Sequence, residues 1–487
     1  MDNGVLVVGA GPTGLMLAAE LALAGVSVQI VERQAVPSGQ SRGGGVNART
    51  AEVFALRGLI DDLTAQAVRR EPGGNHFAGL PVVLDNRPLD TRYPGGLFVP
   101  QDRIETVLEE HLAQWLGVKV RRSTTVTGLV ADDDGVTVTL DGEETLRAAY
   151  VVACDGAHSA VRGLLDVPFP GEAGTLRAVT ADVELASRSE TVPTRMAHIS
   201  KLTRRTADTF MLLHPLFGPD EDTGVYRAVF ASPEQLTIPR ETAVSLDEVQ
   251  RALTTVHGAE TRVARVRWAT RFTDATRQIE NYRHGRVLFA GDAAHIHSPI
   301  GGQGLNLGVQ DAMNLGWKLA AHIHGTAAPG LLDTYNTERH PVAARVLTLT
   351  KAQRLLMAPQ TDDHDAWALR DVLTGLLQVP EANRYLAGIM SGVNIRYDLG
   401  SDEPPVGQRM PDLNLRTADG ETRVSALLHK GNWLLLDLAD LPPVDLPAQV
   451  HHVVAEADAG LGADRVLVRP DGYVAAAGTP NLARWFA

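Results

Sequence analysis

The chain has 487 residues, of which 44% are hydrophobic and 21% are charged, and its formal net charge is −13. This length exceeds what one hydrophobic core usually holds, so a globular protein of two or three domains is expected. The negative charge disfavours a nucleic-acid or anionic-membrane partner, and the single cysteine, Cys154, excludes internal disulfides and multi-cysteine metal sites.

The sequence contains no recognisable signal for export or membrane insertion. The first residues, Met1-Asp2-Asn3, form neither a basic segment nor a cleavable apolar run. No apolar segment reaches the length of a membrane span. A cytoplasmic protein is therefore expected.

A βαβ pattern opens the chain. Its parts are a strand at Val5–Val8, the turn Gly9-Ala10-Gly11-Pro12-Thr13-Gly14, a helix at Leu15–Ala24 and a strand at Val26–Val31. This is the size of a dinucleotide-binding unit, in which the glycines let a pyrophosphate approach the helix N-terminus. Glu32 ends the second strand, where a carboxylate can bind ribose hydroxyls, so FAD or NAD is favoured over NADP. Arg33 either lies over the adenine or is solvated.

The next stretches alternate loops and short elements. Ser41–Thr50 is basic and glycine-rich, and a helix is predicted from Thr50 to Leu59. Gln101 stands at the start of an amphipathic helix that ends near Leu116. Strands are predicted at Val118–Arg121, Thr124–Val130 and Val136–Leu140. The three acids Asp132-Asp133-Asp134 before Gly135 indicate a solvated hairpin turn rather than a metal site.

A second strand end carries a carboxylate at Asp155-Gly156. The run Tyr150–Arg162 predicts a buried strand, this turn, and a helix that starts near Ser159. Cys154 belongs to the apolar strand and is interpreted as a packed thiol rather than a nucleophile.

Residues 173–275 lack nucleotide-binding motifs and alternate polar and apolar residues in short runs. Together with residues 75–100 they predict a separate antiparallel sheet, interrupted by one helix at Leu246–Val256. Its arginines could meet an acidic or phenolate substrate, but a solvated face is the more common role, so none is assigned to a site. They are Arg195, Arg204, Arg205 and Arg227.

The stretch Arg286–Asn306 is the most informative of the chain. A buried strand at Val287–Ala290 runs into Gly291-Asp292, and Pro299 to Gly304 then form a glycine-rich loop that leads into a helix. A helix N-terminus approached by bare backbone favours negative charge. His295 and His297 lie two residues apart, but a metal site would need further ligands.

These three motifs, in this order, resemble those of FAD-dependent aromatic hydroxylases, the single-component flavoprotein monooxygenases of the p-hydroxybenzoate hydroxylase fold. The pattern looks most like the hydroxylases of angucycline, anthracycline and tetracycline pathways, and rifamycin monooxygenases look similar. The resemblance implies an α/β fold: a Rossmann-like FAD-binding domain, an inserted antiparallel substrate domain, and a C-terminal thioredoxin-like domain. Because no cysteine follows Cys154, that last domain is expected to lack redox chemistry and to serve packing or dimer contacts, so a homodimer is one option.

The resemblance also implies a set of cofactor-binding residues. Asp292 is expected to bind the ribityl hydroxyls, and the Pro299 to Asn306 segment to lie along the isoalloxazine. The full set is Gly9, Gly11, Pro12, Thr13, Gly14, Glu32, Arg33, Arg42, Gln101, Val126, Asp155, Asp292, Pro299, Gly301, Gly302, Gly304, Leu305 and Asn306.

The domain boundaries follow from the same resemblance. The FAD-binding domain is expected at 1–74, 101–172 and 276–395, the substrate-binding domain at 75–100 and 173–275, and the thioredoxin-like domain at 405–487. Within this last domain a βαβ-like pattern predicts strands at Trp433–Leu438, Val450–Ala455, Val466–Val468 and Tyr473–Ala476.

The implied reaction consumes O2 and NADPH or NADH as a transient co-substrate, and hydroxylates an aromatic polyketide-type substrate through a flavin C4a-hydroperoxide. FAD is expected to be non-covalent, no metal is expected, and no motif places a catalytic base over the flavin. Baeyer–Villiger oxygenation, inactivation of an antibiotic, and a non-catalytic flavin- or ligand-binding protein stay open as alternatives. A halogenase is disfavoured, since no Trp-x-Trp-x-Ile-Pro segment occurs.

Overall fold

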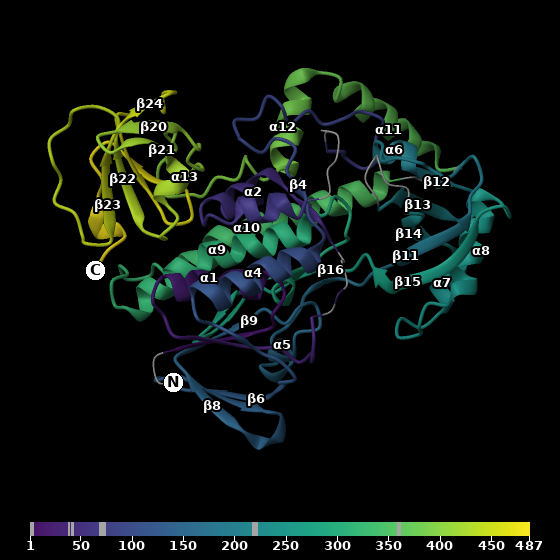
Figure 1. Ribbon diagram of the computed structural model, residues 1–487, viewed down its shortest axis with the longest axis horizontal. Helices are drawn as coiled ribbons and strands as arrows, with labels where there is room; N and C mark the ends of the chain where they lie inside the picture. Colours follow the sequence, from purple (N-terminus) through teal and green to yellow (C-terminus); the bar gives the residue numbers. More distant parts are fainter. Residues whose placement is uncertain (1–3, 38, 40–42, 68–74, 217–222, 358–361) are drawn as a thin grey trace.

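The computed structural model describes residues 4–37, 39, 43–67, 75–216, 223–357 and 362–487 (Figure 1). Two long helices, α9 (Gln303–Ile323) and α10 (Thr334–Leu356), run through the middle of the molecule. An antiparallel sheet lies at one end, and the C-terminal strands lie at the other. None of the helices in the described residues is both long and apolar enough to cross a bilayer.

The central sheet confirms the predicted nucleotide-binding unit. Its strand order is β17-β18-β9-β1-β2-β5. All neighbouring pairs are parallel except the antiparallel pair β17–β18. The strands are β1 (Val5–Val8), β2 (Val28–Val31), β5 (Val120–Arg121), β9 (Tyr150–Ala153), β17 (Arg283–His284) and β18 (Val287–Phe289). The parallel strands place the ends of β1, β9 and β18, and therefore all three predicted motifs, on the same edge.

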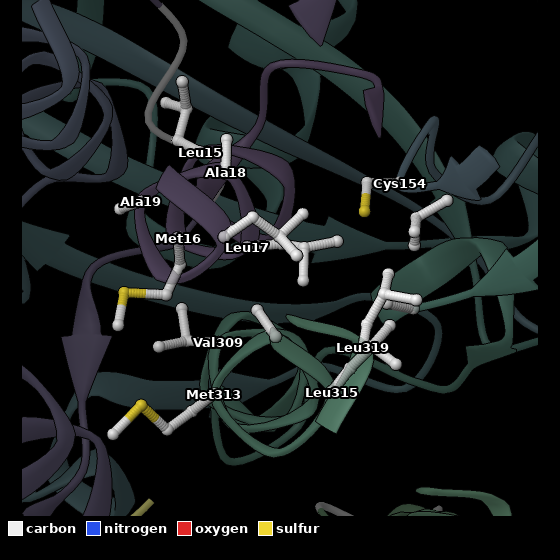
Figure 2. Close-up of a cluster of buried hydrophobic side chains, with 14 of the residues drawn as sticks. Leu15, Met16, Leu17, Ala18, Ala19, Cys154, Val309, Met313, Leu315 and Leu319 are labelled. Atoms are coloured by element: carbon white, nitrogen blue, oxygen red, sulfur yellow. The ribbon is translucent and has the colours of Figure 1, made fainter. Parts of the chain in front are cut away.

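Helix α1 (Pro12–Leu23) packs against α9 beneath this edge, as Figure 2 shows. Leu17 of α1 and Val309 of α9 are fully buried where the two helices meet, whereas Leu15, also fully buried, lies on the far side of α1. Helix α1 begins at Pro12, earlier than predicted, because proline is favoured at the first helical position, where its missing N–H costs nothing. Burial raises the pKa of the Cys154 thiol, which agrees with its interpretation as a packed side chain.

Further elements surround the central sheet. A hairpin sheet joins β6 (Val126–Ala131), β7 (Val136–Leu140) and β8 (Thr145–Ala148), with a short 3₁₀ turn at Asp141–Glu143. The turn between β6 and β7 is the predicted acidic hairpin, where Asp132 accepts hydrogen bonds from the N–H groups of Asp134 and Gly135. The flanking helices are α2 (Ala48–Ala55), α3 (Ile60–Ala65), α4 (Gln101–Trp115) and α5 (Ala160–Leu164), and β3 (Gly45–Val46) pairs with β4 (Leu97–Phe98).

The predicted antiparallel sheet has the order β12-β13-β14-β11-β15. Its strands are β11 (Arg177–Ser187), β12 (Thr203–Arg205), β13 (Phe210–Pro215), β14 (Val225–Ala231) and β15 (Arg262–Thr273). Helix α8 (Leu246–His257) covers one face, and the other face is turned toward the body of the molecule (Figure 1). Helices α6 (Ile199–Leu202) and α7 (Pro233–Thr237) lie at its margins.

Residues 75–98 contribute no strand to this sheet. Their apolar side chains pack instead with the end of α10 and with α11 (His364–Leu376) and α12 (Pro380–Met390). Gln353 of α10 secures this segment by accepting a hydrogen bond from the N–H of Ala78 at 3.1 Å. A small sheet of β10 (Gly171–Glu172), β16 (Thr276–Gln278) and β19 (His295–Ile296) joins the antiparallel sheet to the central part.

The C-terminal region contains two small sheets. One has the order β23-β22-β25-β26 and the other β21-β20-β24. The elements are β20 (Asn414–Thr417), β21 (Gly420–Arg423), α13 (Val424–Leu427), β22 (Trp433–Asp437), β23 (Val450–Val454), β24 (Glu456–Ala457), β25 (Arg465–Val468), β26 (Val474–Ala477) and a 3₁₀ turn at Leu482–Arg484. The four predicted strands are confirmed within two residues. However, β22 and β23 are parallel without a helix between them, so the predicted βαβ-like connection is wrong.

Candidate active site

The three glycines of the first motif serve different purposes. A Cβ at Gly9, whose φ is +104°, would lie 2.5 Å from the carbonyl oxygen of Cys154, and a Cβ at Gly14 would lie 2.0 Å from that of Gly9. Both contacts are impossible, so these two glycines allow β1, α1 and β9 to pack closely. A Cβ at Gly11 would meet nothing within 4 Å. Gly11 therefore borders open space at the start of α1, where no side chain caps the N–H groups.

Glu32 and Arg33 follow β2 at the edge of this space. Glu32 is half-buried, and its Oε2 accepts a hydrogen bond from the N–H of Ala10 at 2.9 Å, while Oε1 accepts one from Gln34 at 2.9 Å. The carboxylate is thus fixed beside the glycine turn. Arg33 is exposed.

Asp155 lies at the end of β9, beside β1. Its Oδ2 accepts a hydrogen bond from the N–H of Val161 at 3.2 Å, but its buried Oδ1 has no hydrogen-bond partner among the described residues. Burial raises the pKa of this carboxyl group. A buried carboxylate oxygen without a partner is costly, which indicates that a further donor belongs here.

The third motif forms a tight corner between β18 and α9. Gly291 has φ +60°, and a Cβ there would lie 2.7 Å from Thr13 Oγ1; a Cβ at Gly308 of α9 would lie 2.2 Å from the same atom. Thr13 therefore fits between the corner and α9 at the start of α1. Because of these contacts the beginnings of α1 and α9 lie close to the corner, which we call the Gly291–Asp292 corner.

Asp292 is exposed although its neighbours Gly291 and Ala293 are buried. A Cβ on Gly304, in the first turn of α9, would lie 3.8 Å from Asp292 Oδ1 and 3.8 Å from His297 Nε2. Gly302, the residue before α9, has φ +63° and offers the helix no side-chain cap, and a Cβ there would meet nothing within 4 Å. Asp292 and the uncapped start of α9 thus adjoin.

Asn306 ties this start to the loop before α2. Its Nδ2 donates to the carbonyl oxygens of Gly45 and Gly302, both at 2.8 Å, and its Oδ1 accepts from the N–H of Asn47 at 2.8 Å. Gln101, at the start of α4, donates from Nε2 to Glu105 at 2.9 Å and lies beside Gly43. Asn306 thus joins the start of α9 to the loop before α2, and Gln101 lies beside that loop.

The remaining predicted residues differ in their surroundings. Pro299 is exposed, Pro12, Gly301 and Leu305 are half-buried, and Val126 is buried in the core at the start of β6. The position of Val126 gives no indication of a direct cofactor contact. Arg42 lies outside the described residues.

Two further groups of residues could take part in binding, and of their members only Arg33 is in the predicted set. Exposed His158 has its pKa lowered by partial burial and by the charges of Arg240, Arg162 and Arg33, so this histidine lies in a cationic environment. Arg162 donates to the carbonyl oxygens of Ala293 and Ala157. The contact between Arg162 and Ala293 joins segments 131 residues apart, and sequence patterns do not reveal such contacts.

The second group lies on the face of the antiparallel sheet opposite α8. Arg227 and Asp182 form a two-fold hydrogen-bonded ion pair at 2.7 and 2.8 Å, so Arg227 is not a free cation. The guanidinium lies 5.9 Å from the ring centre of Trp268, whose buried Nε1 has no acceptor among the described residues.

A cavity of about 200 Å³ lies elsewhere, between the rear of α9, α10 and the chain after α12. It shares Asn306 with the site, but none of the residues of the first glycine turn line it. Among the described residues no group of three or more His, Cys, Asp or Glu side chains could hold a metal ion.

Comparison with known families identifies the chain. Residues 2–350 match the family profile described as FAD binding domain, and residues 403–484 match that of the aromatic-ring hydroxylase C-terminal region. The chain belongs to the FAD-dependent aromatic-ring hydroxylases. It is therefore a flavoprotein monooxygenase, as the three motifs predicted.

Relatives of this hydroxylase are similar over almost its whole length. It is 45% identical to 12-dehydrotetracycline 5-monooxygenase/anhydrotetracycline 6-monooxygenase of Streptomyces rimosus, over 99% of this chain and 96% of the relative. It is 43% identical to rifampicin monooxygenase of Streptomyces venezuelae, over 97% and 95%. The solved structure of the anhydrotetracycline hydroxylase OxyS from Streptomyces rimosus superposes with a TM-score of 0.88 at 41% identity, covering 99% of both chains.

The residues of this hydroxylase fit the cofactor of the family. Three features lie on one edge of the central sheet. They are the open space at Gly11 and Gly302, the uncapped starts of α1 and α9, and the Oδ1 atom of Asp155, which has no hydrogen-bond partner among the described residues. Uncapped helix starts suit a pyrophosphate and an electron-rich flavin edge, and carboxylates suit ribose and ribityl hydroxyls.

Proposed function

We propose that this hydroxylase uses non-covalent FAD, NADPH or NADH, and O2 to hydroxylate an aromatic polyketide-type substrate. The observation that carries this proposal is the exposed Asp292 beside the uncapped start of α9, which faces space that no described side chain fills. The tetracycline- and rifampicin-directed relatives support the substrate class.

In this proposal each motif binds one part of FAD. The start of α1, at Gly11 to Thr13, receives the pyrophosphate, and Glu32 receives the adenosine ribose. Asp292 accepts hydrogen bonds from the ribityl hydroxyls, and the Pro299 to Asn306 segment lies along the isoalloxazine. When bound, FAD would supply the redox chemistry, in which electrons from the nicotinamide and O2 allow one oxygen atom to enter the aromatic ring and the other to leave as water.

The start of α9 has an electrostatic role. The reduced flavin carries negative charge near N1, and the N–H groups of a helix N-terminus stabilise such charge by roughly 0.3–1 kcal/mol or more when partly buried. The absence of a side-chain cap at Gly302 leaves these N–H groups available to the ring.

The cationic group around His158 supports a place for the nicotinamide dinucleotide. The charges of Arg240, Arg162 and Arg33 lower the pKa of His158, and the charge of Asp155 acts on Arg162. A cluster of cations of this kind binds phosphate groups. The nicotinamide binds transiently from this side in our proposal.

The antiparallel sheet face that carries Asp182, Arg227 and Trp268 provides the substrate wall. Its mixture of aromatic surface and one free indole N–H suits a planar polyphenol with carbonyl groups. The proposed domains are 75–100 and 173–275 for substrate, 1–74, 101–172 and 276–395 for FAD, and 405–487 as a thioredoxin-like packing domain. Within the first of these, residues 75–98 pack with α10, α11 and α12 and add no strand to the sheet.

No side chain is assigned as an essential base. Polyketide phenols ionise partly by themselves, so the protein acts mainly by orienting the ring and excluding water. A placed proton-transfer group typically contributes about 10²–10⁴-fold. A single replacement on the substrate wall that slows oxygen transfer a hundredfold, with flavin reduction normal, would contradict this part.

The test uses the purified protein with its flavin. Acid precipitation is expected to release FAD into the supernatant, and a panel of polyketide phenols and quinones is expected to contain compounds that accelerate NADPH or NADH loss. Product mass 16 units above the substrate, with a ring hydroxyl seen by NMR, supports hydroxylation. A lactone indicates Baeyer–Villiger chemistry, and no stimulated oxidation with any aromatic ligand favours a binding protein.

A further inference from the structure

A chain of buried contacts connects the Gly291–Asp292 corner to the C-terminal region. It begins at Asp311 of α9, which is fully buried. Asp311 Oδ2 accepts hydrogen bonds from the N–H of Gly291 at 3.1 Å and from His295 Nε2 at 2.7 Å. One carboxylate therefore holds both ends of the segment that carries Asp292.

Arg339 of α10 holds that carboxylate. Its Nε donates to Asp311 Oδ1 at 2.7 Å, and both side chains are fully buried. Burial acts to raise the pKa of Asp311, but the charges and hydrogen bonds of Arg339 and His295 together outweigh it and keep the pKa below its usual value. Asp311 is therefore a stable anion at neutral pH, and its orientation depends on Arg339.

The other nitrogens of Arg339 point away from the corner. Nη2 donates to the carbonyl oxygen of Leu307 at 3.2 Å, and Nη1 donates to the hydroxyl group of Tyr397 at 3.1 Å. Tyr397 follows α12, and its ring stacks on that of Tyr473, with 4.2 Å between ring centres. Tyr473 precedes β26 and so belongs to the C-terminal region.

Charged residues fix this contact from the same side. Arg469, before Tyr473 in the loop between β25 and β26, donates to Glu338 at 2.9 and 2.8 Å and is itself fully buried. Glu338 is the neighbour of Arg339 on α10, and it also pairs with Lys318 of α9 at 2.8 Å. The C-terminal region is thus bound to the two helices that orient Asp311.

We propose that Arg339 is a positioning residue for the flavin, and that the C-terminal region, through Tyr397 and Tyr473, sets the orientation in which Arg339 holds the Gly291–Asp292 corner. This rests on the proposed contact of Asp292 with the ribityl chain. It gives the C-terminal region, which has no cysteine, a function in cofactor binding without any contact to the cofactor.

The test is a double-mutant cycle on FAD affinity of the full chain. Tyr397→Phe removes only the hydroxyl group that accepts from Arg339, and we expect the Kd for FAD to rise about three- to tenfold with a shifted flavin absorption band. Arg339→Lys keeps the positive charge but loses the three separate nitrogen donors of the guanidinium, and it is also expected to raise the Kd for FAD. Tyr385→Phe, at a tyrosine of α12 that is 65% exposed, is the matched control and leaves the Kd unchanged.

The decisive comparison is made in the Asp292→Ala background. If the path acts on the corner, Tyr397→Phe has no further effect there, because the group that it positions is gone. Additive effects in the double variant would show general loosening and overturn the inference. If Tyr397→Phe and Arg339→Lys both leave the Kd for FAD unchanged while Asp292→Ala still raises it, the positioning role of Arg339 is overturned and the proposed function stays intact. An unchanged Kd in Asp292→Ala would instead remove the contact on which both depend.

Discussion

Glu32 Oε2 accepts a hydrogen bond from the backbone N–H of Ala10 at 2.9 Å, so the acid that ends β2 is held against the glycine turn that begins α1. This contact orients the carboxylate without using all of its lone pairs, since each oxygen can accept a second hydrogen bond. The acid thus has a structural role and can still bind a ribose.

The first prediction separates these two roles of Glu32. Glu32→Gln keeps one oxygen that can accept from Ala10 but loses the charge, and Glu32→Ala loses both. We expect FAD affinity to fall about tenfold or more in Glu32→Ala, since a hydrogen bond to a charged group contributes roughly 1.5–3 kcal/mol. The FAD affinity of Glu32→Gln should lie between those of the unmodified protein and Glu32→Ala. Titration of the apoprotein with FAD measures this, and equal affinity in all three proteins would contradict the ribose contact.

The second prediction concerns the open space at Gly11. Because a Cβ there would meet nothing within 4 Å, Gly11→Val should leave the apoprotein folded but fill the space assigned to the pyrophosphate. FAD binding should be lost while the circular dichroism spectrum is kept. Gly9→Ala is the contrasting variant: its Cβ would lie 2.5 Å from Cys154 O, so it should lower the melting temperature of the apoprotein itself. A Gly11→Val protein that still purifies yellow would place the cofactor elsewhere.

The third prediction concerns Asp292. It is exposed and the pair of helix starts lies next to it, so Asp292→Ala should leave stability nearly unchanged. Its affinity for FAD should fall about tenfold or more, as expected for the loss of a charged acceptor. Asp292→Asn, which keeps an acceptor oxygen, should lose less. Equilibrium dialysis and thermal unfolding of the apoproteins test both statements.

The fourth prediction concerns the cations around His158. His158→Ala should raise the KM for NADPH or NADH several-fold and leave FAD affinity unchanged, because this exposed side chain lies in the cationic group and not on the glycine turn. Steady-state kinetics with a stimulating phenol provide the measurement. His451→Ala, at an exposed histidine of β23, is the control. A fall in FAD affinity with unchanged KM would assign His158 to the flavin instead.

Much of the fold could be predicted because local patterns determine it. The apolar runs Val5–Val8 and Val287–Phe289 are strands in the sheet, and the glycine turn leads into α1 as expected. The start of α1 was predicted too late because Pro12 was assigned to the turn, although proline suits the first helical position. The missing helix between β22 and β23 reflects a parallel pair whose connection has no helical periodicity, so the strand pattern alone suggested a βαβ unit.

Candidate site residues could be predicted where they belong to a local sequence motif, and not where segments far apart in the chain come into contact. Glycines and strand-end acids gave Gly11, Glu32, Asp155 and Asp292, all of which lie on one edge of the sheet. The path from Asp311 through Arg339 to Tyr397 joins positions up to 86 residues apart and has no signal in sequence spacing. The same holds for Arg240 near His158 and for Trp268.

The last prediction concerns acid stability. Two histidines are held neutral: burial and the charge of Arg204 lower the pKa of His257 to about 4, and burial together with His198 lowers that of His76 to about 4. Both values lie below the usual 6.5 of an unfolded chain, so between pH 6.5 and pH 4 the unfolded state binds more protons than the folded state. These groups therefore contribute stability that is complete above pH 6.5 and is lost as the pH falls toward 4.

His257→Gln tests this pH dependence, since glutamine cannot take up the proton but can replace the hydrogen bond to Thr191 Oγ1. The quantity measured is the slope of the unfolding free energy between pH 6.5 and pH 4, and not the stability at pH 7. We expect that slope to be shallower than in the unmodified chain by at most about 1.4 kcal/mol per pH unit, the value for one proton. Urea unfolding of the apoprotein at several pH values gives the slopes. Equal slopes in the two proteins would mean that His257 has the same pKa in the folded and unfolded states, which would contradict the lowered pKa, because only such a group leaves the slope unchanged.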